Sequence, residues 1–351
     1  MGGAVEKVWF ALGQEFVRRG HMVTHLSRRH PKLPNEESIQ GVRHVRLPGF
    51  DSPRTMLRRL GEDFVYSLRA ARALPAADIL VTNTFWLPLL ARNRWPGKIY
   101  VHIQRYPRRQ MVLYQRVARL QTVSNAIADA VRRQAPSIAH KVCVLPNPLP
   151  TEQFRVSPQP TTQPPVILYV GRVHSEKGLE LLVRACAQVT VPHQLRIVGP
   201  WQTEFGGGGE AYFNKLRGLA SPERVQFTGP IFPAAELNAQ FDAATLFVYP
   251  SLAEKGEAFP VAPLEAMARS RVALVSNLAC FHDFIRDGEN GFVFDHRTAN
   301  PVDTLAQTIS TLLAAPGPLA AVAPRAFATA MEFSLPRVAV RYLDDFQSLL
   351  A

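Results

Sequence analysis

Cysteine is scarce in this sequence, with only three among 351 residues. Cys143, Cys186 and Cys280 are odd in number and show no paired spacing, so neither a disulfide framework nor a zinc site is indicated. No apolar run approaches the roughly 18 residues of a membrane span, and no signal-peptide pattern opens the sequence. These absences favour a globular protein of a reducing compartment and predict a cytoplasmic location.

Acidic residues are scarce in the first half of the chain. Residues 1–150 hold 24 Lys and Arg but only 9 Asp and Glu, a net charge of +15. Residues 151–351 hold 16 basic and 19 acidic residues, a net charge of −3. This split indicates two bodies with different partners. No recognised nucleic-acid motif accompanies the basic residues, so nucleic acid is not an expected partner.

Many prolines exclude a helix from residues 142–165, which we interpret as a connection between domains 1–150 and 151–351. Strand-like runs such as "KIYVHI" and "PVILYVG" alternate with helix-like runs on both sides of it. The alternation predicts an α/β fold of two doubly wound, Rossmann-like parallel sheets facing each other across a cleft. We expect the final helix to pack back towards the first domain, and residues 206–209 ("GGGG") to form a flexible surface loop.

Two cations follow the first strand-like run of the second domain. In "ILYVGRVHSEKGLELL" the run ends at Gly171, and Arg172 and Lys177 bracket the short loop before a helix. Ligands of open α/β sheets bind beyond the carboxyl ends of the strands. Two cations at this point can hold a diphosphate, although a solvated loop that happens to be charged is the alternative.

Two carboxylates lie further along, in "YPSLAEKGEAFPVAPLEAMA". Pro260 and Pro263 forbid one continuous helix, and Pro263 suits the first helical residue. Glu257 is therefore expected on the incoming loop and Glu265 in the first helical turn, where free N–H groups favour anions. Glu265 could alternatively be a capping carboxylate, whereas nothing structural requires Glu257. Cations can bind the phosphates of a ligand, and carboxylates can accept hydrogen bonds from its hydroxyls. Together these groups indicate a nucleotide diphosphate that bears a sugar.

Five stretches together resemble family 4 of the retaining glycosyltransferases, which have the GT-B fold. The stretches, in order along nearly the whole chain, are "GGAVEKVWFALGQEFVRRGHMVT", "VLPNPLPTEQF", "YVGRVHSEKGLELLVRA", "FVYPSLAEKGEAFPVAPLEAMA" and "FIRDGENGFVFD". Glu257 and Glu265 match the E-x7-E motif of that family. The motif alone is weak evidence, but the five stretches in series are strong evidence.

The resemblance implies roles for residues of the second domain. Arg172 and Lys177 would neutralise the diphosphate of the donor, beyond the strand end at Gly171. Glu257 would contact hydroxyls of the transferred sugar, and Glu265 would accept from the ribose hydroxyls. The backbone amides of Val261 and Ala262 would face phosphate.

The resemblance also implies roles in the first domain. His102 matches a histidine close to the reacting sugar, with a buried core histidine as the alternative. Gly2 and Gly3 match a loop at which the backbone approaches donor or acceptor. Asn83 and Arg105 are the other residues expected on the acceptor side.

The sequence departs from the family pattern at three places. Pro260 replaces a glycine, and Asn83 stands where relatives often have histidine. The β-strand that normally precedes the first glycine loop is missing, so either the start is truncated or the first sheet lacks a central strand. This departure affects the expected roles of Gly2 and Gly3 but not the donor side.

We therefore expect a retaining, hexosyltransferase-like enzyme that moves a sugar from a nucleotide-diphosphate sugar to an acceptor hydroxyl, in cell-envelope glycan or glycolipid synthesis. No D-x-D metal motif occurs, and no metal or other cofactor is expected. His21 and His25 have H-x3-H spacing, but a metal site there is not expected. The alternatives are a relative that hydrolyses or epimerises nucleotide sugars, and a non-catalytic protein that binds polyanions or sugar nucleotides.

Basic and aromatic residues are interleaved in "RYPRRQMVLYQRVARLQ", residues 105–121. Such a pattern suits a surface on anionic lipid, and the first domain of the resembled fold generally binds the acceptor. The segment therefore predicts a lipid-linked or otherwise anionic acceptor, reached from the cytoplasmic face of a membrane. A solvated basic face is the alternative. The pattern combines Arg105, Arg108, Arg109, Arg116 and Arg119 with Tyr106, Met111, Leu113 and Tyr114.

Overall fold

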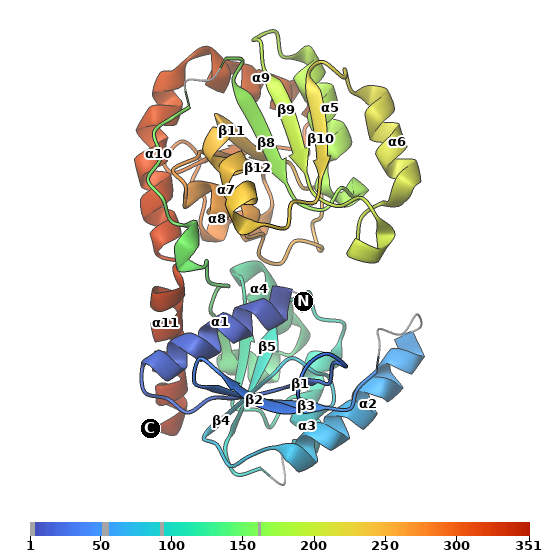
Figure 1. Cartoon of the computed structure of the whole chain (residues 1–351), viewed down its shortest axis with the longest axis vertical. Helices are drawn as coiled ribbons and strands as arrows, with labels where there is room; N and C mark the ends of the chain where they lie inside the picture. The colour runs from blue at the N-terminus through green and yellow to red at the C-terminus, as the bar shows by residue number, and fades with distance from the viewer. Residues whose placement is uncertain (1–3, 51–55, 92–94, 161–162) are drawn as a thin grey trace. The chain divides into compact units, whose positions relative to one another are not determined.

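A computed structural model describes residues 4–50, 56–91, 95–160 and 163–351. The chain forms two compact units (Figure 1). Unit 1 comprises Met1–Pro148 and Leu335–Ala351, and unit 2 comprises Leu149–Ser334. The boundary thus lies two residues before the sequence-based one, and the last helix belongs to unit 1.

Unit 2 contains a six-stranded parallel sheet of order β10-β9-β8-β11-β12-β13. The sequence order reverses between β8 and β11, which is the position at which open α/β sheets bind ligands. Both strands are almost wholly buried, as their continuous apolar runs require. The strands are β8 (Val166–Val170), β9 (Gln194–Val198), β10 (Val225–Gly229), β11 (Leu246–Tyr249), β12 (Ala273–Ser276) and β13 (Phe292–Phe294).

Helices connect the strands of unit 2 and cover its sheet (Figure 1). They are α5 (Leu179–Gln188), α6 (Gly209–Leu219), α7 (Ala234–Ala243), α8 (Ala262–Met267), α9 (Pro301–Ala314) and α10 (Pro316–Met331). Within the described ranges, no single helix has the length and apolar character needed to cross a membrane. One bent pair, Pro301–Ala314 with Gly317–Met331, meets that test by length and composition only.

The strands of unit 1 form two separate sheets. In the order β1-β3-β2, β1 is parallel and β2 antiparallel to β3; the order β4-β5-β6-β7 is entirely parallel. Among the described residues, no hydrogen-bonded strand joins β1 to β4. The strands are β1 (Thr24–Arg28), β2 (Glu36–Ile39), β3 (Val42–Leu47), β4 (Ile79–Thr82), β5 (Lys98–Ile103), β6 (Arg119–Thr122) and β7 (Val142–Val144).

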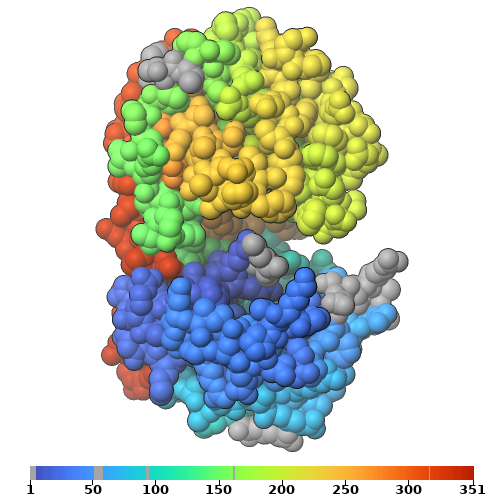
Figure 2. All heavy atoms as spheres, in the orientation of Figure 1, coloured from blue at the N-terminus to red at the C-terminus, as the bar shows by residue number. Residues whose placement is uncertain are grey.

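The expected connection over residues 142–165 is wrong at its beginning. Residues 142–144 form β7, which pairs with β6 inside unit 1. Strand β2 was not expected from the sequence either. Its polar residues lie beside an exposed stretch, 28–36, at the surface of unit 1 in the blue part of Figure 2.

Unit 1 contains both the first and the last helix of the described chain. They are α1 (Ala4–Arg18), α2 (Met56–Ala73), α3 (Leu87–Ala91), α4 (Asn125–Gln134) and α11 (Leu335–Leu350). Helix α1 contributes Leu12 and Phe16 to a core that they share with Tyr100 of β5 and Tyr342 of α11. Ser124 caps α4 by accepting a hydrogen bond from Ile127 N.

A polar cluster adds to the apolar contacts between α11 and the sheet of unit 1. Asp345 of α11 accepts hydrogen bonds from the Tyr100 hydroxyl at 2.8 Å and from the Cys143 thiol at 3.4 Å. Its other oxygen lies 2.7 Å from Arg119 of β6. Burial raises the pKa of Tyr100 far above its usual range, so the hydroxyl stays a donor.

Candidate functional site

The loop after β8 is held against the end of β11. After Gly171 the chain passes through a short 3₁₀ turn (Ser175–Lys177) to Gly178, which has a positive φ of 69°. A Cβ on Gly178 would lie 2.0 Å from the carbonyl oxygen of Pro250, so only glycine fits this close approach. The turn therefore brings the chain after β8 directly against the chain after β11.

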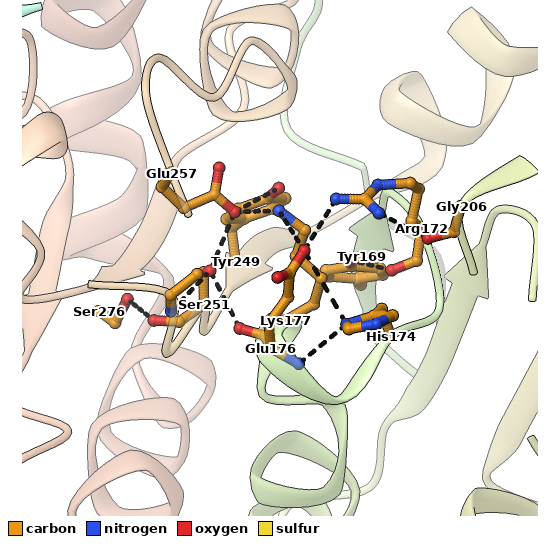
Figure 3. A network of polar contacts seen from close by, with 11 residues as sticks. Tyr169, Arg172, His174, Glu176, Lys177, Gly206, Tyr249, Ser251, Glu257 and Ser276 are labelled. Carbon is orange, nitrogen blue, oxygen red and sulfur yellow. Dashed lines mark hydrogen bonds and ion pairs between the residues drawn. The ribbon is translucent and has the colours of Figure 1, made fainter. Parts of the chain in front are cut away.

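Lys177 and Glu257 form a buried ion pair at this point (Figure 3). Each side chain is about 7% exposed. The same carboxylate oxygen, Oε1, also accepts from Ser251 Oγ at 2.9 Å and from the Tyr249 hydroxyl at 3.2 Å. Glu257 thus has a structural role, because the buried ammonium group of Lys177 needs a counter-ion. The sequence-based statement that nothing structural requires Glu257 is wrong.

The second carboxylate oxygen of Glu257, Oε2, takes no part in these contacts. Figure 3 shows this oxygen directed away from Lys177, and no partner of Oε2 occurs within the described ranges. A carboxylate fixed through one oxygen presents the other in a defined orientation. Glu257 can therefore accept a ligand hydroxyl while it remains paired with Lys177.

Arg172 is held by two acceptors. Its guanidinium donates to Glu176 at 2.8 Å and to the carbonyl oxygen of Gly206. Gly208 N in turn donates to the carbonyl oxygen of Val173 at 2.8 Å. The stretch 206–209 is therefore packed against the loop after β8, which corrects the expectation of a flexible surface loop.

Two tyrosines form the base of the site. Tyr169 of β8 and Tyr249 of β11 stack with ring centroids 5.5 Å apart, and Lys177 Nζ lies 5.6 Å from the centroid of the Tyr249 ring. The Tyr169 hydroxyl donates to the carbonyl oxygen of Arg172 at 2.9 Å. Burial raises the pKa of both tyrosines well above the usual value, so both hydroxyls remain donors.

Helix α8 begins one residue earlier than the sequence suggested. Val261 precedes it, Ala262 is its first residue and Pro263 its second. No backbone N–H of the described residues donates to the Glu265 carboxylate, so the capping alternative does not hold. The carboxyl group of Glu265 has no hydrogen-bond partner within the described ranges. Part of the residue's surface stays exposed, but desolvation by the surrounding protein raises the pKa of the carboxyl to about 7.

The expected site residues of unit 1 lie on or after two neighbouring strands. Asn83 follows β4 and Arg105 follows β5, and both are exposed. His102 of β5 is buried: its Nδ1 bonds Gln121, its Nε2 has no partner, and Trp9 packs edge-on against its ring. Desolvation lowers the pKa of His102 to about 4, so the imidazole is neutral at pH 7. Gly2 and Gly3 lie outside the described residues.

The basic segment of unit 1 divides into a buried and an exposed set. Met111 and Tyr114, which the sequence pattern placed on the surface, are buried core residues. Arg119 is 19% exposed and paired with Asp345, so it too is not part of a free basic face. What remains is the basic surface, which we define by the exposed side chains of Arg105, Arg108, Arg109, Val112, Leu113 and Arg116.

Sequence reasoning missed five residues of the site: Tyr169, Glu176, Gly206, Tyr249 and Ser251. Glu176 stood between the two expected cations, and this position was the available signal. Ser251 lies two residues after the end of the buried strand β11, in the region where open α/β sheets bind ligands. Across the described ranges, no group of three His, Cys, Asp or Glu side chains has the arrangement of a metal site.

Solved structures of similar architecture include glycosyltransferases and a sucrose-phosphate synthase. Sucrose-phosphate synthase from Thermosynechococcus elongatus has a TM-score of 0.81 at 21% identity, covering 99% of this chain and 94% of that one. The Anabaena protein HepE, solved in complex with UDP and glucose, has a TM-score of 0.74 at 16% identity, covering 99% and 96%. The protein thus has the GT-B glycosyltransferase fold.

Two family models show to which family of glycosyltransferases the chain belongs. Residues 1–153 match Glycosyltransferase Family 4, and residues 164–315 match Glycosyl transferases group 1. The chain belongs to glycosyltransferase family 4.

Two curated relatives illustrate the similarity. D-inositol 3-phosphate glycosyltransferase of Rhodococcus jostii is 30% identical over 193 residues, 52% of this chain and 40% of that protein. Phosphatidyl-myo-inositol mannosyltransferase of Mycobacterium tuberculosis is 27% identical over 311 residues, 82% and 78%. The match to the Rhodococcus protein thus spans less than half of that relative's length.

Proposed function

We propose that this protein is a retaining glycosyltransferase that transfers a sugar from a nucleotide-diphosphate sugar to an acceptor hydroxyl in glycan or glycolipid synthesis. One observation carries the proposal: Lys177 pairs with Glu257, and Arg172 lies in the same loop, at the carboxyl ends of β8 and β11, where the strand order reverses. Cations at this position neutralise a diphosphate, and carboxylates there orient hydroxyls. The names of the relatives, which include a D-inositol 3-phosphate glycosyltransferase and a phosphatidyl-myo-inositol mannosyltransferase, support the same reaction class.

The chemistry requires stabilisation of the leaving nucleoside diphosphate. A unit-charge contact at 4 Å is worth about 4 kcal/mol at an effective dielectric of 20. Lys177 and Arg172 supply two such contacts, and Glu257 Oε2 orients a sugar hydroxyl. Glu265 accepts from the ribose hydroxyls. The departing phosphate takes the proton of the acceptor, since no side chain of unit 2 described above is placed as a base. In this proposal His102 acts close to the reacting sugar, and Asn83 and Arg105 belong to the acceptor side.

Product analysis tests the proposal directly. The full chain is incubated with UDP-, GDP- and ADP-sugars, each with inositol phosphate, phosphatidylinositol or no acceptor. Mass spectrometry should detect a glycosylated acceptor, and NMR should find the anomeric configuration of the donor retained. Free sugar formed equally with and without acceptor would identify a hydrolase, an altered nucleotide sugar an epimerase, and binding without any product a non-catalytic protein.

We expect turnover to be independent of divalent metal. Two side-chain cations and no D-x-D motif accompany the proposed diphosphate position. Addition of EDTA should therefore leave the initial rate within about twofold of the untreated enzyme. Loss of turnover in EDTA that magnesium restores would contradict this prediction.

We further propose that the basic surface of unit 1 contacts anionic lipid and that the acceptor is lipid-linked or otherwise anionic. Four exposed arginines lie in the same short segment as the apolar side chains of Val112 and Leu113, each of which is 46% exposed. A basic side chain near an anionic membrane contributes about 1 kcal/mol, and apolar side chains between the bases can enter the interface. The cytoplasmic face of a membrane is the proposed location.

Vesicle co-sedimentation measures this contact. The chain should bind vesicles that contain anionic lipid but not neutral vesicles, and binding should weaken as salt rises. An Arg108→Glu, Arg116→Glu variant should lose most of the binding, whereas Arg184→Glu, Arg224→Glu, the same charge change at two exposed arginines of unit 2, should retain it. Absence of binding to anionic vesicles at low salt would indicate an enzyme with a soluble acceptor.

A further inference from the structure

Glu176 lies between the two cations that the proposed donor diphosphate would need. Its Oε1 is 2.8 Å from Arg172 Nη2 and 4.0 Å from Lys177 Nζ (Figure 3). The same oxygen is 3.9 Å from Nδ1 of His174. The backbone N–H of Glu176 donates to that Nδ1, so the ring proton of His174 lies on Nε2. A carboxylate of the chain thus occupies the position at which an anion would meet Arg172.

The two internal carboxylates of the site differ in how firmly they are held. Glu257 is about 7% exposed and accepts from Lys177, Ser251 and Tyr249. Glu176 is 33% exposed, and Arg172 is its closest cationic partner. An ion pair that is open to water is far weaker than a buried one with several donors. An arriving anion will therefore displace Glu176 before it displaces Glu257.

Arg172 does not depend on Glu176 alone for its position. Its other nitrogen donates to the carbonyl oxygen of Gly206, and a Cβ on Gly206 would lie 3.1 Å from that nitrogen. The glycine loop therefore keeps the guanidinium in place when its second donor changes partner. An exchange of one anion for another at Arg172 needs no movement of the arginine.

We propose that Glu176 is a built-in competitor of the donor: its carboxylate binds Arg172 until the diphosphate replaces it, and it then turns towards solvent. This inference rests on the proposed function, because it assumes that a diphosphate binds at Arg172 and Lys177. The competitor lowers the affinity of the site for every anion. It thereby favours ligands whose charge is large enough to displace it, such as a diphosphate over a monophosphate, and it speeds release of the nucleoside diphosphate product.

Calorimetric titration of the full chain tests this with three probes: UDP, GDP and inorganic pyrophosphate. Glu176→Gln retains an acceptor for Arg172 but removes the competing charge, so the Kd of the bound probes should fall about fivefold or more at low salt. Because Glu176 is partly exposed, the difference should shrink as ionic strength rises. Glu176→Asp, which keeps the charge, should stay closer to the wild type than Glu176→Gln.

Glu180→Gln is the matched control. Glu180 lies four residues further on and pairs with the exposed Lys215, so its change removes the same net charge outside the site. It should leave the Kd within about twofold. If the wild type binds the probes and Glu176→Gln binds them equally or more weakly, Glu176 is a positioning residue and the inference is overturned alone. If neither protein binds any probe, the proposed donor site fails together with the inference.

Discussion

Lys177→Ala lowers turnover with the nucleotide-sugar donor by about 100- to 1000-fold, the usual cost of removing one preorganised group that stabilises developing charge. Lys177 Nζ also neutralises Glu257 in an environment where both side chains are about 7% exposed. The variant leaves Glu257 as an unpaired buried charge, which costs about 3–5 kcal/mol of stability. Steady-state kinetics and thermal unfolding measure the two effects separately.

A double variant distinguishes lost chemistry from lost stability. Lys177→Ala with Glu257→Gln removes the unpaired charge, so its unfolding temperature should recover while turnover stays low. Lys215→Ala, which removes an exposed lysine from the pair with Glu180, should leave both measurements nearly unchanged. Donor kinetics of Lys177→Ala within twofold of the wild type would show that Lys177 serves structure alone.

The pairing of Lys177 with Glu257 could not be read from the sequence. The two residues are separated by 80 positions, and each was assigned by its place after a strand. Periodicity identifies strands but does not state which of them are neighbours in a sheet. Only the order β9-β8-β11-β12 puts the ends of β8 and β11 side by side and joins the ammonium to the carboxylate. The sequence motifs therefore predicted both residues as site residues, but only the order of the strands shows that they are in contact.

Elements with a strong apolar period were predicted well. The run "KIYVHI", which was expected as a strand, forms β5 in full. Strand β2 pairs with β3 alone and lies at a surface, so it has four, mostly polar, residues and no apolar pattern that would mark it as a strand. Strand β7 was hidden in a proline-rich stretch, since its three residues precede the first proline there. Such short elements depend on tertiary contacts that no local pattern records.

The basic segment shows the same limit within one stretch of chain. Its pattern of arginines and large apolar residues gave no means of separating buried from exposed side chains. In the fold, the Tyr114 hydroxyl donates to the carbonyl oxygen of Phe85, and Met111 is 2% exposed, so these two stabilise unit 1. Val112 and Leu113 lie between them in sequence and face solvent. The 3₁₀ turn (Gln110–Leu113) determines this division.

Glu265 makes donor binding depend on pH around neutrality. Its pKa of about 7 means that the carboxyl is mostly protonated at pH 6 and mostly ionised at pH 8. Only the ionised form accepts hydrogen bonds from both ribose hydroxyls, so the affinity for a nucleotide sugar should rise about tenfold from pH 6 to pH 8. A nucleotide sugar is the correct probe because its diphosphate does not titrate in this range, unlike that of a free nucleoside diphosphate.

The stability of the unliganded protein should change in the opposite direction. The pKa of Glu265 is raised by burial from 4.5 to about 7, so the folded protein binds the proton more tightly than the unfolded chain. The stabilising contribution is complete below pH 4.5 and is lost as pH rises to 7. Glu265→Gln should therefore be more stable than the wild type at pH 8, by about 1–3 kcal/mol, and equal to it near pH 4.5.

The same variant completes the binding test. Glu265→Gln should weaken nucleotide-sugar binding at pH 8 by about 10- to 100-fold, because hydrogen bonds to a charged acceptor contribute about 1.5–3 kcal/mol each. It should also remove the rise in affinity between pH 6 and pH 8. Glu254→Gln, which changes an exposed carboxylate paired with Arg297, is the control and should keep the wild-type profile. If Glu265→Gln gains stability at pH 8 but keeps the wild-type affinity and its pH dependence, the carboxyl of Glu265 does not bind the ribose.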